Sequence, residues 1–123
     1  MCRPDWPMNW QAIPKHRKAT TRDWDKGKVL EWSSRIGSQS QYNPYSYGSD
    51  EAVSELEMKC VEYGEPILAV GIKRTFYLNT FATTGVCLGE ETTYVYAEWH
   101  QSGGFIHGRP ISVTALQRMG VNI

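Results

Sequence analysis

Ionisable side chains gather in one short stretch of the sequence, EWHQSGGFIHGRP, which spans residues 98–110. Two histidines, His100 and His107, lie on either side of a Gly-Gly pair, with Glu98 before the first and Arg109 after the second. An imidazole titrates close to neutral pH, and a guanidinium binds phosphates and carboxylates through two parallel hydrogen bonds. This stretch is therefore the candidate functional site of the chain.

The glycines in this stretch predict a β-hairpin. A two-residue turn centred on Gly103 and Gly104 is expected, because primed turns need positive φ angles that glycine adopts without strain. This register places His100 opposite His107, and it places the preceding glutamate opposite the arginine. A wider turn is the alternative, in which the two histidines remain neighbours but the glutamate and the arginine separate.

Side chains alternate along a strand, so the hairpin has two faces. One face is apolar and is predicted to belong to the core; it carries Val95, Ala97, Trp99 and Ile106. The second face is too polar to be buried without partners and too aromatic for ordinary surface. We interpret it as the ligand-binding face, which carries Tyr94, Tyr96, Glu98, His100, Phe105, His107 and Arg109.

Three kinds of chemistry fit this face. Two imidazoles and a carboxylate can bind a divalent metal ion, although no HExxH-like spacing accompanies them. A metal-independent phosphodiesterase or ribonuclease would use Glu98 as base, His100 or His107 as acid and Arg109 to hold the phosphate. A binding site without turnover would hold an anion on the arginine and stack a base on the aromatic rings. The structural alternative is a cross-strand ion pair worth under about 1 kcal/mol.

Binding without catalysis is the leading hypothesis, because it requires neither tuned pKa values nor an exact reaction geometry. The ligand is expected to be nucleotide-like or otherwise anionic, with no cofactor and no metal ion. Small proteins without a familiar motif are often accessory factors of phages or mobile elements that sequester a ligand. Inhibition of a host protein through tryptophan and tyrosine surfaces is the alternative, since binding hot spots favour Trp, Tyr and Arg.

A second candidate surface lies in the first half of the chain. Residues 1 to about 27 form an irregular arm that is rich in tryptophan, and residues 1–36 hold eight Lys or Arg against four Asp or Glu. The arm is expected to pack on the body or on a second subunit, which favours a homo-oligomer. Its basic and aromatic residues, with those of the following loop, are Trp10, Lys15, Arg17, Lys18, Trp24, Tyr42, Tyr45 and Tyr47.

Length and composition indicate a single domain without a membrane segment, a disulfide framework or a zinc ribbon. A chain of 123 residues has the usual size of one domain, so residues 1–123 are expected to form a single domain. No apolar run is long enough for a membrane span or a secretion signal, which predicts a cytoplasmic protein with no membrane partner. Thirteen basic residues balance thirteen acidic ones, and three cysteines without CxxC spacing indicate neither a disulfide framework nor a zinc ribbon.

The remaining pattern predicts an α+β fold, with an antiparallel sheet of about four to six strands. The main helix is expected at residues 50–63, after a cap at Ser49 or Asp50 and before Gly64, with the stripe Val53, Leu56, Cys60 and Tyr63 facing the sheet. Strands are expected at residues 28–36, 67–73, 75–82 and from 91 to 99, and a loop at residues 37–49. One long strand with a bulge at Gly71 is the alternative to the strand pair. A short terminal helix is expected between Ser112 and Gly120.

Overall fold

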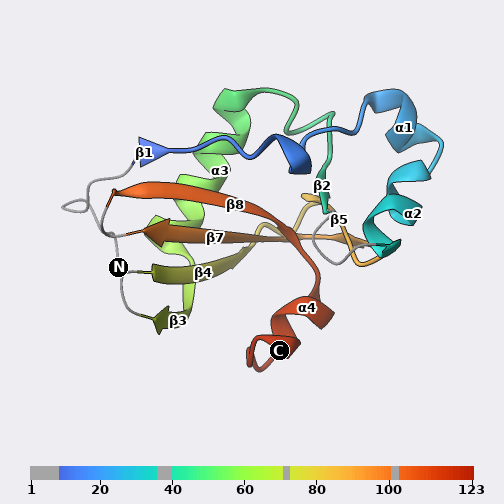
Figure 1. Ribbon diagram of the computed structural model, residues 1–123. Coiled ribbons are helices and arrows are strands. Elements are labelled where there is room, and N and C mark those ends of the chain that lie inside the picture. Colours follow the sequence, from blue (N-terminus) through green and yellow to red (C-terminus); the bar gives the residue numbers. More distant parts are fainter. Residues whose placement is uncertain (1–8, 36–39, 71–72, 101–102) are drawn as a thin grey trace.

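The computed structural model describes residues 9–35, 40–70, 73–100 and 103–123 (Figure 1). The fold is α+β, with a five-stranded sheet, a small three-stranded sheet and α-helices around them. In chain order the elements are β1 (Asn9–Trp10), the 3-10 helix η1 (Pro14–His16), α1 (Thr21–Asp25), α2 (Lys28–Arg35), β2 (Gln41–Tyr42), α3 (Asp50–Tyr63), β3 (Glu65–Val70), β4 (Lys73–Asn79), β5 (Gly85–Cys87), β6 (Glu90–Thr92), β7 (Tyr94–His100), β8 (Phe105–Ile111) and α4 (Val113–Arg118).

The large sheet has the strand order β1-β8-β7-β4-β3. Four of its strands pair in antiparallel fashion, as expected, whereas β1 lies parallel to β8 at one edge. The prediction of an antiparallel sheet of about four to six strands is confirmed, and the arm adds one short parallel strand at this edge. The arm carries no periodic pattern, so its two-residue strand and the pairing with β8 could not be read from the sequence.

The main helix α3 has the predicted bounds. The Ser49 hydroxyl accepts a hydrogen bond from the Ala52 N–H at 3.1 Å, which caps the first turn, and Gly64 follows the last residue. Val53, Leu56 and Cys60 are buried as predicted, but Tyr63 is 57% exposed. At 100° per residue Tyr63 falls at the edge of the stripe, and the helix ends there.

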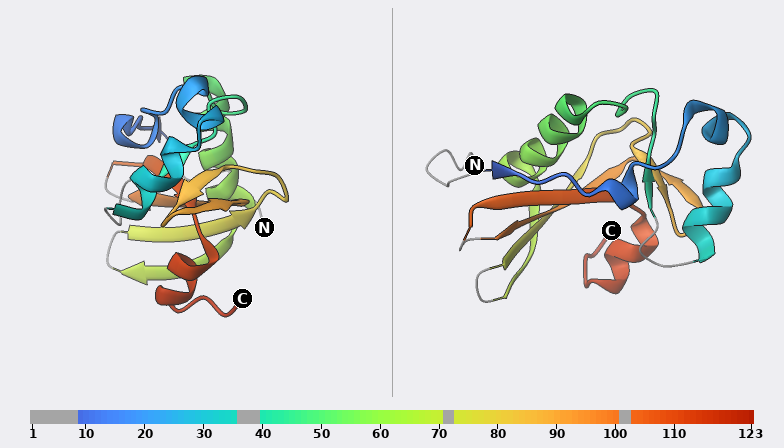
Figure 2. Two further views of the ribbon diagram at one scale, coloured as in Figure 1. Left: turned by 90° about the vertical axis from the view of Figure 1, so that its right-hand side faces the viewer. Right: turned by 45° about the horizontal axis from the view of Figure 1, so that its top comes forward.

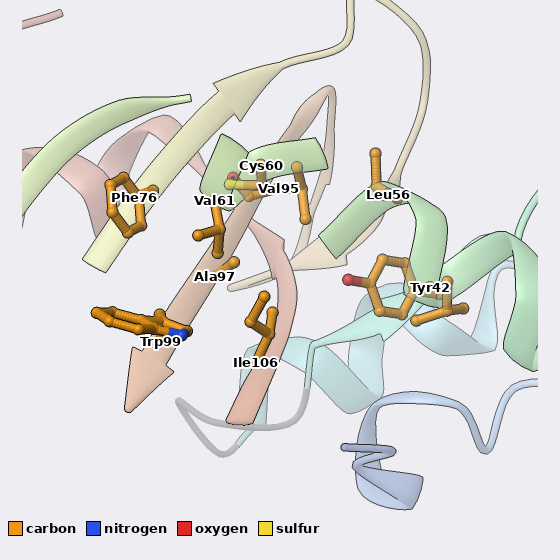
Figure 3. Close-up of a cluster of buried hydrophobic side chains, with 10 residues drawn as sticks. Tyr42, Leu56, Cys60, Val61, Phe76, Val95, Ala97, Trp99 and Ile106 are labelled. Carbon is orange, nitrogen blue, oxygen red and sulfur yellow. Dashed lines mark hydrogen bonds between the residues drawn. The ribbon is translucent and has the colours of Figure 1, made fainter. Parts of the chain in front are cut away.

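The core lies between α3 and the large sheet (Figure 3). The predicted apolar face of the hairpin is confirmed, because its four side chains are each at most 4% exposed; they are Val95, Ala97, Trp99 and Ile106. Phe76 of β4 and Tyr42 of β2 complete this cluster together with the buried side chains of α3. The second face of β7 and β8 consequently points away from α3, and we call it the open face.

The terminal helix α4 covers one end of the open face. Leu116 is fully buried against Tyr96, Ile111 and Cys87, and Figure 2 shows α3 and α4 on opposite sides of the strands. The predicted start is confirmed by the Ser112 hydroxyl, which accepts from the Ala115 N–H at 3.1 Å. The end of the open face that lies far from α4 holds the candidate site.

Residues 28–35 form α2, so the predicted strand at 28–36 is wrong, and residue 36 lies outside the described residues. The buried positions Val29 and Ser33 are four residues apart, which is the spacing of one helix face. The preceding helix α1 begins with a capping box in which Thr20 and Asp23 bond each other reciprocally. Valine and tryptophan favour strands, but here packing outweighs that weak preference.

Two further strand predictions need correction. The run from residue 91 is split at Thr93 into β6 and β7, which belong to different sheets. The pair β3 and β4 is confirmed as two strands, but the chain reverses before Lys73 rather than after it. The register shift lies between Pro66 and Leu68, whereas Gly71, where a bulge was considered, is outside the described residues.

The predicted loop at 37–49 contains a strand that was not expected. Gln41 and Tyr42 form β2, which pairs with β5, and residues 37–39 are not described. The Gln41 side chain also binds the arm, because it accepts from the backbone N–H groups of Lys18 and Ala19 and donates to the Lys15 carbonyl at 2.6 Å. Among the helices that the structure describes, none is both long and apolar enough to cross a membrane.

Candidate functional site

The pairing of β8, β7 and β4 arranges the open face in rows of neighbouring side chains. Paired residues on adjacent strands point to the same side of a sheet, and successive rows are two residues apart. The first row holds Phe105, His100 and Lys73; the second holds His107, Glu98 and Thr75; the third holds Arg109, Tyr96 and Tyr77.

The predicted register of the hairpin is wrong by two residues. His100 pairs with Phe105 rather than with His107, so four residues separate β7 from β8. A type I′ turn needs positive φ at both central positions and a type II′ turn needs it at the first, but of the pair only the second, Gly104, has it, at 68°. A shift of two residues leaves every side chain on its predicted face, because the period of a strand is two.

The two histidines are nevertheless neighbours on one carboxylate. Glu98 Oε2 lies 3.2 Å from His107 Nε2 and 3.4 Å from His100 Nε2. The imidazole rings stack, with centroids 5.3 Å apart and planes inclined by 21°. We call Glu98, His100 and His107 the acid–base cluster.

The other oxygen of Glu98 binds two further side chains. Glu98 Oε1 lies 2.8 Å from Lys73 Nζ and accepts a hydrogen bond from the Tyr96 hydroxyl at 2.7 Å. Burial alone would raise the pKa of Glu98, but the bonds from Lys73 and Tyr96 and the charge of Lys73 lower it to about 2. Glu98 is therefore a fixed negative charge at neutral pH and a weak base.

His107 and Arg109 complete the charged part of the open face. Burial lowers the pKa of His107, and the Glu98 charge opposes that effect only in part. The Arg109 guanidinium lies 4.6 Å from the centroid of the Tyr96 ring, in a cation–π contact. An imidazole that is neutral at pH 7 thus lies beside a permanent cation.

Sequence reasoning missed two residues near this cluster. Lys73 reaches Glu98 from β4, and only the register of β4 with β7 reveals it, so no local pattern could have found it. His16 of η1 lies within electrostatic range of His107 and Arg109. Its Nδ1 is 2.9 Å from the Ser40 carbonyl oxygen, and burial lowers its pKa to about 4, so it is a neutral interior group.

The charges decide what the cluster favours as a ligand. Its three ligand atoms lie within 4.8 Å of one another, which suits a divalent ion in shape. However, Lys73 shares the Glu98 carboxylate, and Arg109 lies in the next row. These two cations outnumber the one carboxylate, and this balance of charge favours an anion over a dication.

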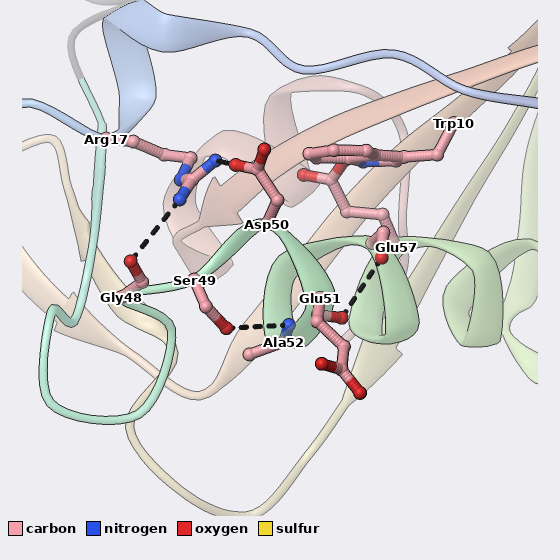
Figure 4. Close-up of polar contacts among 9 residues, drawn as sticks. Trp10, Arg17, Gly48, Ser49, Asp50, Glu51, Ala52 and Glu57 are labelled. Atoms are coloured by element: carbon pink, nitrogen blue, oxygen red, sulfur yellow. Dashed lines mark hydrogen bonds and ion pairs between the residues drawn. The ribbon is translucent and has the colours of Figure 1, made fainter.

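The second predicted surface is divided by the fold. Arg17, Tyr42 and Tyr47 line a hollow of about 220 Å³, where Arg17 binds Asp50 and the Gly48 carbonyl (Figure 4). The remaining members lie elsewhere or have interior roles: Trp10 donates to Glu57 at 2.7 Å, Tyr45 donates to Asp25, Lys15 and Lys18 are exposed, and Trp24 is half-buried in α1.

Comparisons with protein-family models, with curated proteins and with solved structures found no match for this chain.

Proposed function

We propose that the protein is a metal-independent phosphodiesterase that cleaves RNA on the open face of its sheet. The observation that carries this proposal is the buried Glu98 carboxylate in contact with both imidazoles, next to Lys73 and Arg109. A site that only captured anions would be weakened by a carboxylate at its centre. Acid–base catalysis uses such a carboxylate, because it orients an imidazole and stabilises its protonated form.

RNA is the substrate class because its 2′-hydroxyl supplies an internal nucleophile. A base removes the 2′-hydroxyl proton, the O2′–P bond forms, and the P–O5′ bond breaks as an acid protonates the leaving oxygen. The products are a 2′,3′-cyclic phosphate and a free 5′-hydroxyl. This reaction needs two proton-transferring groups and cations for the phosphate, and it needs no metal ion or cofactor.

Each role follows from the surroundings of the side chain. A carboxylate with a pKa of about 2 is a weak base, so Glu98 holds the imidazoles in place rather than taking the proton. His107, whose pKa burial lowers, is the base. The acid is His100, the second imidazole that contacts Glu98. With Nε2 of His107 facing Glu98, its Nδ1 lone pair is left to accept the proton. Arg109 and Lys73 stabilise the charge that develops on the phosphate.

The test is cleavage of a single-stranded RNA by the purified protein in the presence of EDTA. We expect products ending in 2′,3′-cyclic phosphate, identified by mass spectrometry, and no cleavage of a matched strand with 2′-deoxyriboses. His107→Ala should lower the rate by about 100-fold or more, whereas Lys18→Ala, an exposed residue of the arm, should leave it unchanged. If the protein binds the RNA and releases it intact, the proposal is wrong and the protein captures a ligand. If cleavage requires a divalent ion, the proposal is wrong and the site uses metal catalysis.

A further inference from the structure

We infer that Phe105 and Asn9 form a subsite for one unpaired nucleobase, next to the acid–base cluster. This inference rests on the proposed function and names the kind of RNA that the site accepts. The first observation is that Phe105 is 47% exposed, although Ile106 and Ile111 of the same strand are fully buried. Its ring belongs to the open face, in the same row as His100 and one row from His107.

The position of the Phe105 ring depends on a glycine. A Cβ atom at Gly103 would lie 2.6 and 2.7 Å from two ring carbons, which is closer than any side chain tolerates. One edge of the ring therefore lies against Gly103, where the lack of a side chain leaves room for it. A ring held on a rigid strand loses little conformational freedom when a base stacks on it.

The arm places a polar side chain next to this ring. Asn9 pairs with Phe105, and because Trp10 points to α3, where it donates to Glu57 at 2.7 Å, Asn9 lies on the open face. Backbone bonds from Asn9 to the Gly104 carbonyl at 2.7 Å and from Gln11 to the Ile106 carbonyl at 2.8 Å hold β1 in this position. The exposed amide offers both a donor and an acceptor for the edge of a base.

The spacing of the rows fits one nucleoside. Rows on a strand are roughly 7 Å apart, because each residue advances about 3.3 Å. A base stacked on Phe105 in the first row therefore has its own phosphate near His107 and Arg109 in the second and third rows. Aromatic rings stack on unpaired bases of any kind, whereas a duplex keeps its bases stacked on one another. The subsite thus selects single-stranded RNA.

The closing experiment separates binding from cleavage. Binding is measured by fluorescence anisotropy with a 2′-deoxy oligonucleotide, which cannot be cleaved by 2′-hydroxyl attack, and with the same strand carrying an abasic position. Kinetics are measured with the RNA strand. Phe105→Ala should raise Kd and KM by about 10- to 100-fold and leave kcat nearly unchanged, and Phe105→Trp should retain binding.

Two variants make the result specific. Phe81→Ala is the matched control, because Phe81 is 86% exposed on the loop after β4, away from the rows of the open face. Asn9→Ala should change the relative cleavage rates of strands that differ only in the base next to the cleaved bond. Equal effects of Phe105→Ala and Phe81→Ala, or equal affinity for the abasic strand, would overturn the subsite. Binding that depends on Phe105 without any cleavage of RNA would support the subsite and refute the proposed catalysis.

Discussion

At the scale of single residues, the candidate site depends on Glu98, because one carboxylate contacts four side chains. Oε1 is bound by Tyr96 and Lys73, and Oε2 faces His100 and His107. Only the carboxylate form can accept from all of them, and the pKa of about 2 keeps it in that form at neutral pH. An ion pair needs only one of these partners, and the convergence of two imidazoles on Glu98 is what supports the proposed catalysis.

Replacement of Glu98 by glutamine should separate a catalytic role from an electrostatic one. The amide has the same shape but carries no charge and offers a donor where Oε2 accepted. We expect kcat for RNA cleavage to fall by about 100-fold or more, because the imidazoles lose their orientation. KM should stay the same or decrease, since a negative charge beside the phosphate is removed.

Steady-state kinetics on Glu98→Gln, with Glu55→Gln as control, check this expectation. Glu55 is an exposed glutamate of α3 that has no part in the open face. A variant with unchanged kcat and raised KM would show that Glu98 only helps to bind the substrate, in contradiction to its role as the positioning carboxylate.

At the scale of elements, the sequence predicted those features that depend on residues close together in the chain, namely helix caps and the alternation of strand side chains. The helices α3 and α4 could be recognised because Ser49 and Ser112 cap them through their own neighbours. The faces of the hairpin could be predicted because alternation survives a shift of two residues. The register, the partner strand that brings Lys73 to Glu98 and the parallel edge strand β1 depend on contacts distant in sequence, which no local pattern encodes.

Glu57 makes the docking of several elements dependent on pH. It is 2% exposed on α3 and accepts from Tyr42 of β2 at 2.5 Å, from Trp10 of β1 at 2.7 Å and from the Gly108 N–H of β8. Burial raises the pKa of Glu57 from 4.5 to about 7, although these hydrogen bonds oppose the shift. A carboxyl whose pKa is raised by folding contributes stability fully below pH 4.5 and loses it as the pH rises through 7.

Glu57→Gln should remove this dependence, because the amide stays neutral while its oxygen and nitrogen still bond Trp10 and Tyr42. The difference in unfolding free energy between wild type and Glu57→Gln should change by about 3 kcal/mol from pH 5 to pH 8, in favour of the variant at high pH. His16, whose pKa burial lowers, acts in the opposite direction, so the comparison uses the difference between the two proteins. Urea denaturation at several pH values measures it, and a difference that is constant with pH would contradict the assignment.

At the scale of the whole molecule, the two sides of the large sheet differ in how far other elements cover them. α3 and the arm close one side over the core, while α4 closes only part of the other. The arm, which was expected to serve a second subunit, places Trp10 against α3 of the same chain. The homo-oligomer stays a prediction, and the face that remains open is the one that carries the acid–base cluster.

The balance of charge over the whole chain predicts how RNA binding responds to salt. Thirteen basic residues match thirteen acidic ones, so the proposed binding of RNA has to depend on local cations. Among the described residues of the open face these are Lys73 and Arg109. Each neutralised phosphate of a single strand contributes a slope of about −0.7 to log K against log salt. Two cations therefore predict a slope of about −1.4 between about 50 and 200 mM salt.

Anisotropy titrations with the uncleavable strand measure this slope. Arg109→Gln should reduce its magnitude by about 0.7, because one phosphate contact is lost. Lys18→Gln should leave it unchanged, since Lys18 is an exposed residue of the arm. A steeper slope that responds to Lys18→Gln but not to Arg109→Gln would place the RNA on the basic arm. That result would contradict the proposed site, because RNA bound on the arm would not contact the acid–base cluster.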